Sequence, residues 1–112
     1  MNKLWERLST KQFQSLFESG KFVSGRLISI NAKFEGDKNL VGFAVKRSKV
    51  KKNSVERNRI RRRLREAFLK IQDLLPEGLQ IVIIGDSDVE FAPIDEISAE
   101  ILRLTKRIDN KC

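Results

Sequence analysis

The side chains best suited to chemistry in this 112-residue chain are basic, and they gather between Lys46 and Arg65. That segment holds 11 lysines and arginines and one acid, Glu56, so it carries a net charge of +10. Because the whole chain carries +8, the remainder sums to −2. One cationic segment on an otherwise balanced chain predicts a binding surface for a polyanion.

Every basic residue between Glu56 and Glu66 is an arginine. A guanidinium group donates paired hydrogen bonds to phosphate and stacks on bases, which favours structured RNA as the polyanion. Like charges four residues apart, such as Arg57 and Arg61, weaken an isolated helix by ~0.2–0.5 kcal/mol per pair. This cost indicates a ligand that supplies the missing negative charge.

Three other interpretations of the basic segment stay open at this point. It could be a solvated surface, although such surfaces usually intersperse acids. It could lie on a membrane or bind calmodulin, although its apolar residues fit a protein core. DNA would satisfy the same electrostatics, but the sequence shows no helix-turn-helix pattern and no zinc-finger spacing.

Catalysis by this chain alone is not indicated. The chain has no histidine, which removes the usual general base and the commonest metal ligand. Its single cysteine, Cys112, excludes an internal disulfide and a cysteine-based metal cage. The acidic residues are scattered without paired spacing. We therefore expect no catalytic residue, no bound metal and no cofactor in this chain.

The elements that must position the basic residues follow from apolar periodicity and caps. Ser9 and Gln12 fit a capping box, Ile28 and Ile30 alternate with polar residues, and an apolar period of 3.6 runs through the basic segment. We predict helices at about 10–19, 54–75 and 93–108, and strands at 26–34, 40–46 and 79–84. This order of helix, strand, strand, helix, strand, helix indicates an α+β fold, a single domain over residues 1–112.

The apolar residues of the sequence also indicate where in the cell the protein acts. No apolar run approaches the ~20 residues that span a bilayer. Residues 1–8 lack an apolar stretch of signal-peptide length. We expect a cytoplasmic protein with no membrane partner.

Several of these stretches resemble one known family. The run from Arg57 to Arg62, Arg-Asn-Arg-Ile-Arg-Arg, resembles the RNR signature helix of bacterial ribonuclease P proteins. Residues 41–47 resemble the strand that precedes this helix, and Phe13, Phe17 and Gly20 resemble the family's opening. The resemblance covers roughly residues 7–108.

This resemblance implies a two-layer α-β sandwich with a left-handed β-α-β crossover. It implies an accessory protein subunit, monomeric in the complex, of the ribonucleoprotein endonuclease that removes the 5′ leader of precursor tRNA. The catalytic RNA subunit of the family performs the hydrolysis with Mg²⁺. The alternative is a ribosome-associated or general structured-RNA-binding protein without nuclease context.

The resemblance also implies which residues bind. The expected RNA-binding residues are Lys46, Arg47, Lys49, Lys51, Lys52, Arg57, Asn58, Arg59, Arg61, Arg62 and Arg65. The expected leader cleft, between the first helix and the sheet, holds Phe13, Phe17, Ser29, Asn31, Gly42 and Ala44. Alternatively, the two phenylalanines pack in the core, and Gly42 and Ala44 make room for a helix. Ser29 and Asn31 depart from the apolar or aromatic residues that the family often has, which predicts weaker stacking of the leader.

Overall fold

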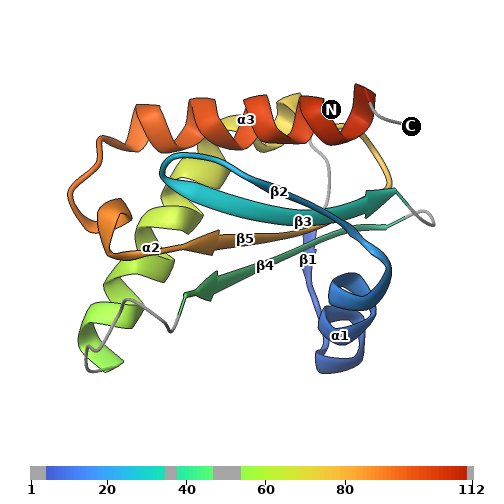
Figure 1. Ribbon diagram of the computed structural model, residues 1–112, viewed down its shortest axis with the longest axis horizontal. Coiled ribbons are helices and arrows are strands. Elements are labelled where there is room, and N and C mark those ends of the chain that lie inside the picture. The colour runs from blue at the N-terminus through green and yellow to red at the C-terminus, as the bar shows by residue number, and fades with distance from the viewer. Residues whose placement is uncertain (1–4, 35–37, 47–53, 111–112) are drawn as a thin grey trace.

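A mixed five-stranded sheet organises the chain in the computed structural model, which describes residues 5–34, 38–46 and 54–110 (Figure 1). The elements in chain order are β1 (Trp5–Arg7), α1 (Thr10–Ser19), β2 (Lys21–Ser24), β3 (Ile28–Phe34), β4 (Asn39–Val45), α2 (Ser54–Ile71), the 3₁₀ helix η1 (Gln72–Leu74), β5 (Leu79–Gly85), the 3₁₀ helix η2 (Ser87–Glu90) and α3 (Ile94–Asn110). The strand order across the sheet is β1-β4-β5-β3-β2. The α+β class predicted from the sequence is confirmed.

The strands pair in both senses. β4 lies parallel to β5 and to β1, whereas β3 is antiparallel to β5 and to β2. The chain passes from β4 through α2 to the adjacent parallel strand β5, as a β-α-β crossover requires. The left hand of that crossover stays a prediction.

The predicted order of elements was wrong at two places. It omitted β1 and β2, which have three and four residues and lie at the two edges of the sheet. Strands this short carry too few residues for a visible alternation. The long basic helix also ends at Ile71, not near Leu75, and continues as η1.

The larger core lies between one face of the sheet and helices α2 and α3, and Figure 1 shows α3 running along that face. The predicted apolar stripe of α2 is buried here: Ile60, Leu64 and Phe68 are at most 2% exposed. They pack with Ile30 and Ile83 of the central strands. The arginines of α2 are therefore carried on a helix that is anchored to the core from Ile60 to Ile71.

Helix α1 lies on the opposite face of the sheet. The predicted capping box is present, since Ser9 Oγ accepts from the Gln12 N–H at 3.2 Å and Gln12 Oε1 accepts from the Ser9 N–H at 2.7 Å. Leu16 packs in a second cluster with Leu40 and Val82. α1 covers only part of this face, because Ser29, Ala44 and Ile84 stay half-buried.

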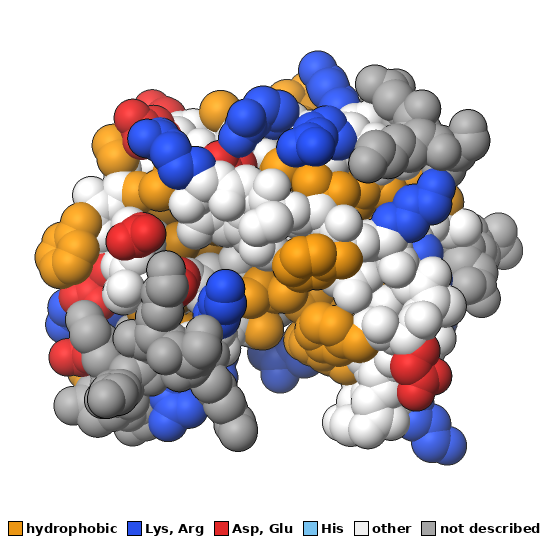
Figure 2. Space-filling model, viewed as in Figure 1, with side chains coloured by type: hydrophobic (Ala, Val, Ile, Leu, Met, Phe, Trp, Pro, Cys, Tyr) orange, Lys and Arg blue, Asp and Glu red, His pale blue; other side chains and the backbone are white. Residues whose placement is uncertain are grey.

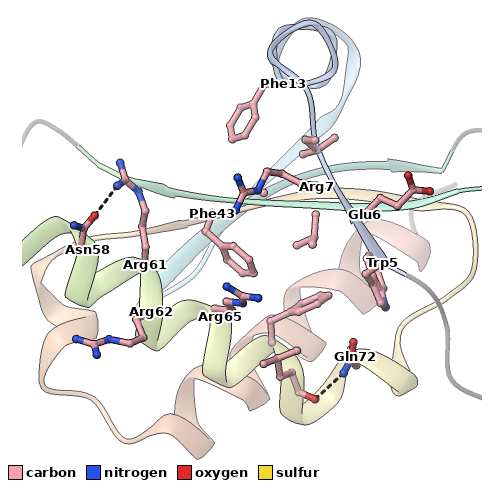
Figure 3. Close-up of a pocket in the computed structure, with 15 residues that line it drawn as sticks. Trp5, Glu6, Arg7, Phe13, Phe43, Asn58, Arg61, Arg62, Arg65 and Gln72 are labelled. Atoms are coloured by element: carbon pink, nitrogen blue, oxygen red, sulfur yellow. Dashed lines mark hydrogen bonds between the residues drawn. The ribbon is translucent and has the colours of Figure 1, made fainter.

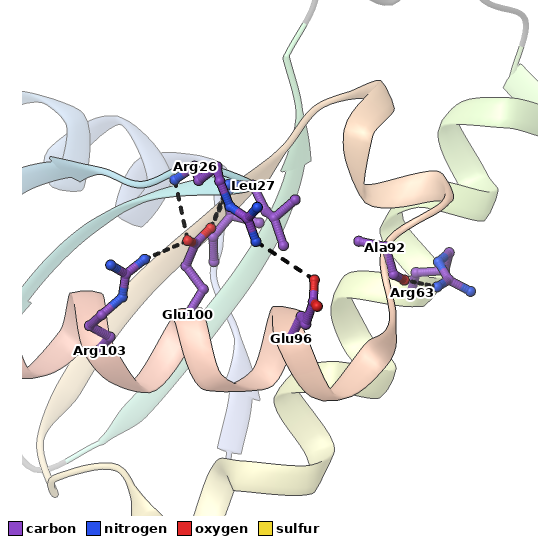
Figure 4. Close-up of polar contacts among 8 residues, drawn as sticks. Arg26, Leu27, Arg63, Ala92, Glu96, Glu100 and Arg103 are labelled. Atoms are coloured by element: carbon purple, nitrogen blue, oxygen red, sulfur yellow. Dashed lines mark hydrogen bonds and ion pairs between the residues drawn. The ribbon is translucent and has the colours of Figure 1, made fainter.

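A buried carboxylate ties α3 to the turn between β2 and β3 (Figure 4). Glu100, which is 5% exposed, accepts hydrogen bonds from the backbone N–H groups of Leu27 at 2.6 Å and Ile28 at 2.9 Å. Its other oxygen accepts from the Arg26 N–H at 3.2 Å and from Arg103 Nη2 at 2.6 Å. The charge is thus fully partnered, as a buried carboxylate must be.

Candidate nucleic-acid interface

The exposed side of α2 presents the cationic residues predicted from the sequence. Asn58, Arg61, Arg62 and Arg65 are exposed, and Arg57 is half-buried near the start of the helix. The buried stripe faces the opposite way, because a 3.6-residue period separates apolar from polar sides. The fold therefore brings this part of the predicted site together on one surface.

Two other arginines of α2 are engaged within the protein. Arg59 Nη1 forms an ion pair with Glu90 Oε1 at 3.2 Å. Arg63, which is half-buried, donates from Nε to the Val89 carbonyl at 3.0 Å and from Nη2 to the Ala92 carbonyl. These contacts hold η2 and the segment after it against α2. Arg59, although predicted to bind RNA, shares its charge with the protein's own carboxylate.

The remaining arginines of the helix are available to bind an anionic ligand. Within the described ranges, no carboxylate oxygen lies within 4.0 Å of the guanidinium groups of the following residues: Arg57, Arg61, Arg62 and Arg65. Arg61 Nη1 donates to Asn58 Oδ1 at 3.2 Å, which orients it along the helix. Such unpaired guanidinium forks fit phosphate oxygens.

A cleft of about 1040 Å³ opens beside these arginines, at the edge of the sheet where β1 pairs with β4. Figure 3 shows Phe13 reaching into it from α1 and Phe43 facing it from β4. Arg61 and Arg65 enter from α2, and Arg7 enters from β1. Arg62 also lines it, so the cleft combines apolar rings with four cationic groups.

The predicted leader-cleft residues lie on the α1 face of the sheet, but α1 covers some of them. Asn31 is 3% exposed, and Gly42 is buried beneath Phe13. Ser29 and Ala44 lie on the uncovered part, beside α1. Figure 2 shows the surface hollowed next to α1, with apolar side chains bordering the hollow.

The two phenylalanines of α1 have different surroundings. Phe13 is half-buried and packs on the smaller core cluster, whereas Phe17 is 51% exposed. Their ring centroids are 5.9 Å apart. Phe13 therefore combines core packing with a place at the cleft, and Phe17 offers its ring to a ligand.

The basic residues after β4 fall in two groups. Lys46 is exposed at the end of β4 and lines a smaller cavity of about 220 Å³ together with Ser29 and Ile84. Its backbone N–H donates to the Gly85 carbonyl at 2.8 Å, which fixes the strand end. The other predicted residues of this loop lie outside the described residues: Arg47, Lys49, Lys51 and Lys52.

Several residues of the cleft were not predicted as site residues, among them Phe43 of β4 and two residues of β1. Trp5 and Arg7 belong to β1, the three-residue strand that no pattern revealed. Arg7 faces α2 because it pairs with Val41, whose side chain packs on the larger core. The available signal was an arginine two residues after a tryptophan, and only the pairing with β4 shows which way these side chains face.

Neither a membrane-spanning helix nor a cluster of metal ligands is found in the described part of the chain. No helix in residues 5–34, 38–46 and 54–110 is long and apolar enough to cross a membrane. Within the same ranges, no three side chains of the metal-binding types cluster closely enough to hold an ion.

Comparison with known proteins gives a consistent result. The family model described as Ribonuclease P matches residues 1–109. The chain is 34% identical over 99 residues to the ribonuclease P protein component of Brevibacillus brevis, covering 87% of this chain and 77% of the relative. It is 32% identical to that of Carboxydothermus hydrogenoformans, covering 98% of this chain and 99% of the relative. The structure resembles the RNase P protein of Thermotoga maritima with a TM-score of 0.76 and 28% identity, covering 92% of this chain and 97% of that one.

Proposed function

The chain belongs to the ribonuclease P protein family, and from this membership and its cationic surface we propose how it acts. It is a protein subunit of ribonuclease P, the ribonucleoprotein endonuclease of tRNA 5′ maturation. It binds the catalytic RNA through α2 and the 5′ leader of precursor tRNA through the groove beside α1. In this proposal it works in the cytoplasm as one copy per complex.

The observation that carries the proposal is the set of unpaired guanidinium groups on α2. Arg61, Arg62 and Arg65 are exposed without a carboxylate partner among the described residues, on a helix whose other side is buried. Repulsion between these like charges opposes helix formation. Contact with RNA phosphates replaces this repulsion with charge-assisted hydrogen bonds.

The groove beside α1 supports the leader-binding part of the proposal. Phe17 offers an exposed ring, and unpaired bases stack on such rings with ~1–3 kcal/mol each. Ser29 and Ala44 are half-buried on the sheet face that α1 partly covers, and Lys46 supplies an exposed charge at the end of β4. Side chains as small as those of Ser29 and Ala44 would let a nucleic-acid backbone approach the sheet.

Hydrolysis, in this proposal, belongs to the RNA subunit, which also holds the Mg²⁺ ions. The family resemblance supports this division. The protein contributes by neutralising phosphate repulsion and by retaining the leader, so that precursor is held in preference to mature tRNA. Retention of the leader lowers the substrate concentration that the RNA needs. Neutralisation of phosphate repulsion lowers the magnesium concentration that it needs.

Reconstitution tests the proposal. The protein, added to a bacterial catalytic RNA at low Mg²⁺ concentration, is expected to restore cleavage of precursor tRNA at the 5′ end of the mature sequence. The assembled enzyme is expected to bind precursor more tightly than mature tRNA, because only the precursor has a leader. No stimulation across several bacterial catalytic RNAs, with tight binding to ribosomal RNA instead, would favour a ribosome-associated protein.

A further inference from the structure

The cleft between β1 and α2 has an aromatic interior as well as a cationic rim. Phe43 is half-buried at its floor, with its ring centroid 5.8 Å from that of Phe68 in an edge-to-face arrangement. Phe13 borders the cleft from the side of α1. A helix that only tracked phosphates along a duplex would need the rim and not the recessed rings.

The charges of the rim come from both walls. Arg7 of β1 and Arg65 of α2 enter the cleft from opposite sides, and Arg61 adds a third charge (Figure 3). In the described ranges none of the three lies within 4.0 Å of a carboxylate oxygen. Glu6 also lines the cleft, but it lies 3.9 Å from Lys38 Nζ. The interior therefore has a net positive field with no internal counter-charge on its arginines.

One residue that lines the cleft has a buried donor group without an acceptor among the described residues. The indole Nε1 of Trp5 is shielded from solvent and has no hydrogen-bond acceptor among the described residues. Trp5 is held in place by Phe68, with ring centroids 4.8 Å apart at 89°. An indole N–H usually has an acceptor when it is buried, and none of the described residues supplies one here.

We propose that this cleft takes an unpaired nucleotide of an RNA partner, with its base against Phe43 and Phe13 and its phosphate between Arg7 and Arg65. The cleft is large enough, because its volume of about 1040 Å³ lies just above the roughly 300–1,000 Å³ typical of pockets that enclose small organic ligands. A paired base has both faces stacked and cannot turn one to the rings. An acidic peptide would meet the arginines but would leave the aromatic floor unused.

This inference rests on the RNA-binding role proposed for α2 and adds to it a recognition site for one unstacked base. It gives β1 a function, since Arg7 is exposed there without an ion pair in the described part of the chain. Arg7 also lies outside the RNR helix. Its substitution therefore tests the cleft without removing any arginine of α2.

The chain carries its own reporter for the test, because Trp5 lines the cleft and is the one tryptophan in the sequence. A ribo-oligonucleotide of five adenosines is expected to change the Trp5 fluorescence on binding. A blunt-ended RNA duplex with the same number of phosphates is expected to change it much less at equal occupancy. An equal change with the duplex would show that phosphate contacts alone are involved, and would overturn the proposal.

Arg7→Ala and Arg65→Ala are each expected to weaken binding of the oligonucleotide by about tenfold, as the loss of a charge-assisted hydrogen bond does. Lys106→Ala is the matched control, because it removes one exposed charge from α3, away from the cleft. The control is expected to bind within about twofold of the wild type. Equal affinities for Arg7→Ala, Arg65→Ala and Lys106→Ala would overturn the nucleotide site.

Parallel cleavage assays separate this proposal from the subunit role. A wild-type protein that restores cleavage by the catalytic RNA but gives no Trp5 response to the oligonucleotide would overturn the nucleotide site alone. A Trp5 response that Arg7→Ala abolishes, in a protein that restores no cleavage, would support the nucleotide site and overturn the subunit role. A response to a glutamate octapeptide, and not to the oligonucleotide, would replace RNA with an acidic peptide.

Discussion

Arginines that look alike in the sequence have different tasks on α2. Arg63 is turned inward, to the carbonyl groups of Val89 and Ala92, whereas Arg62 is exposed with no ion pair in the described ranges. Their separation is one residue, which rotates the side chain by about 100° around the helix. The direction of each guanidinium therefore decides whether it stabilises the protein or meets a ligand.

Substitutions of these two neighbours are expected to differ in their effect on stability. Arg63→Ala removes two hydrogen bonds from a charged donor and is expected to lower the free energy of unfolding by ~1.5–3 kcal/mol. Arg62→Ala is expected to change it by less than ~0.5 kcal/mol, as exposed substitutions do. Urea unfolding measures both. Equal losses of stability in the two variants would contradict the assignment.

The residues that the sequence identified well are those whose role depends on their near neighbours. The density of arginine from Arg57 to Arg65 predicted the cationic helix, because charge and helical period are both local. The pairing of Arg59 could not be predicted, since its partner Glu90 lies 31 positions away. The same holds for the burial of Asn31 beneath α1, which depends on where a separate element docks.

At the scale of elements, the position of α1 depends on a close approach to β4. A Cβ atom built on Gly42 would lie 2.6 Å from Cε2 of Phe13 and 3.1 Å from Cδ1 of Leu8. Only glycine lets the helix sit this near to β4. This contact places Phe13 at the cleft, and the ring of Phe17 stays exposed beside the neighbouring groove.

Gly42→Ala is therefore expected to displace α1 and to lower the free energy of unfolding by ~1–3 kcal/mol, the usual cost of an overpacked core. Leader-dependent discrimination between precursor and mature tRNA is expected to decrease as well. In the double variant with Phe13→Ala the added methyl group has room, so the two losses are expected to be less than additive. Strict additivity in a double-mutant cycle would contradict the contact.

The sequence predicted elements whose apolar residues repeat over several turns or several strand residues. The stripe of α2 and the apolar run of β5 are of this kind. β5 was found within one residue of its predicted ends, whereas α2 begins where predicted but ends at Ile71. β1 is held by pairing with β4, more than 30 positions away, and its three residues show no pattern of their own. The cleft was missed for that reason, since one of its walls is β1.

At the scale of the whole molecule, the charge is segregated. The segment from Lys46 to Arg65 carries +10, while the remainder of the chain sums to −2. In the described part of that segment Arg61, Arg62 and Arg65 lie on the exposed side of α2, whereas Arg59 and Arg63 contact η2 and the residues after it. Long-range attraction of RNA to one side of the protein follows from this distribution.

Binding to the catalytic RNA is therefore expected to depend steeply on salt. Neutralising ~6–10 phosphates lowers the association constant by ~10³–10⁵ between 50 and 200 mM salt, because condensed counterions are released on binding. Filter binding across this range measures the slope. A flat profile would show that charge on α2 contributes little to the complex.

The central claim is that the exposed guanidinium groups of α2 hold the catalytic RNA, and a charge-matched comparison of affinities tests it most directly. Arg61→Ala with Arg62→Ala removes two charges from that surface, and Lys106→Ala with Arg107→Ala removes two exposed charges from α3. The α2 pair is expected to weaken binding to a bacterial catalytic RNA by ~10²-fold, at unchanged stability, since each charged contact is worth roughly tenfold. The α3 pair is expected to weaken it by only about threefold through long-range electrostatics. Equal losses in the two double variants would contradict the account.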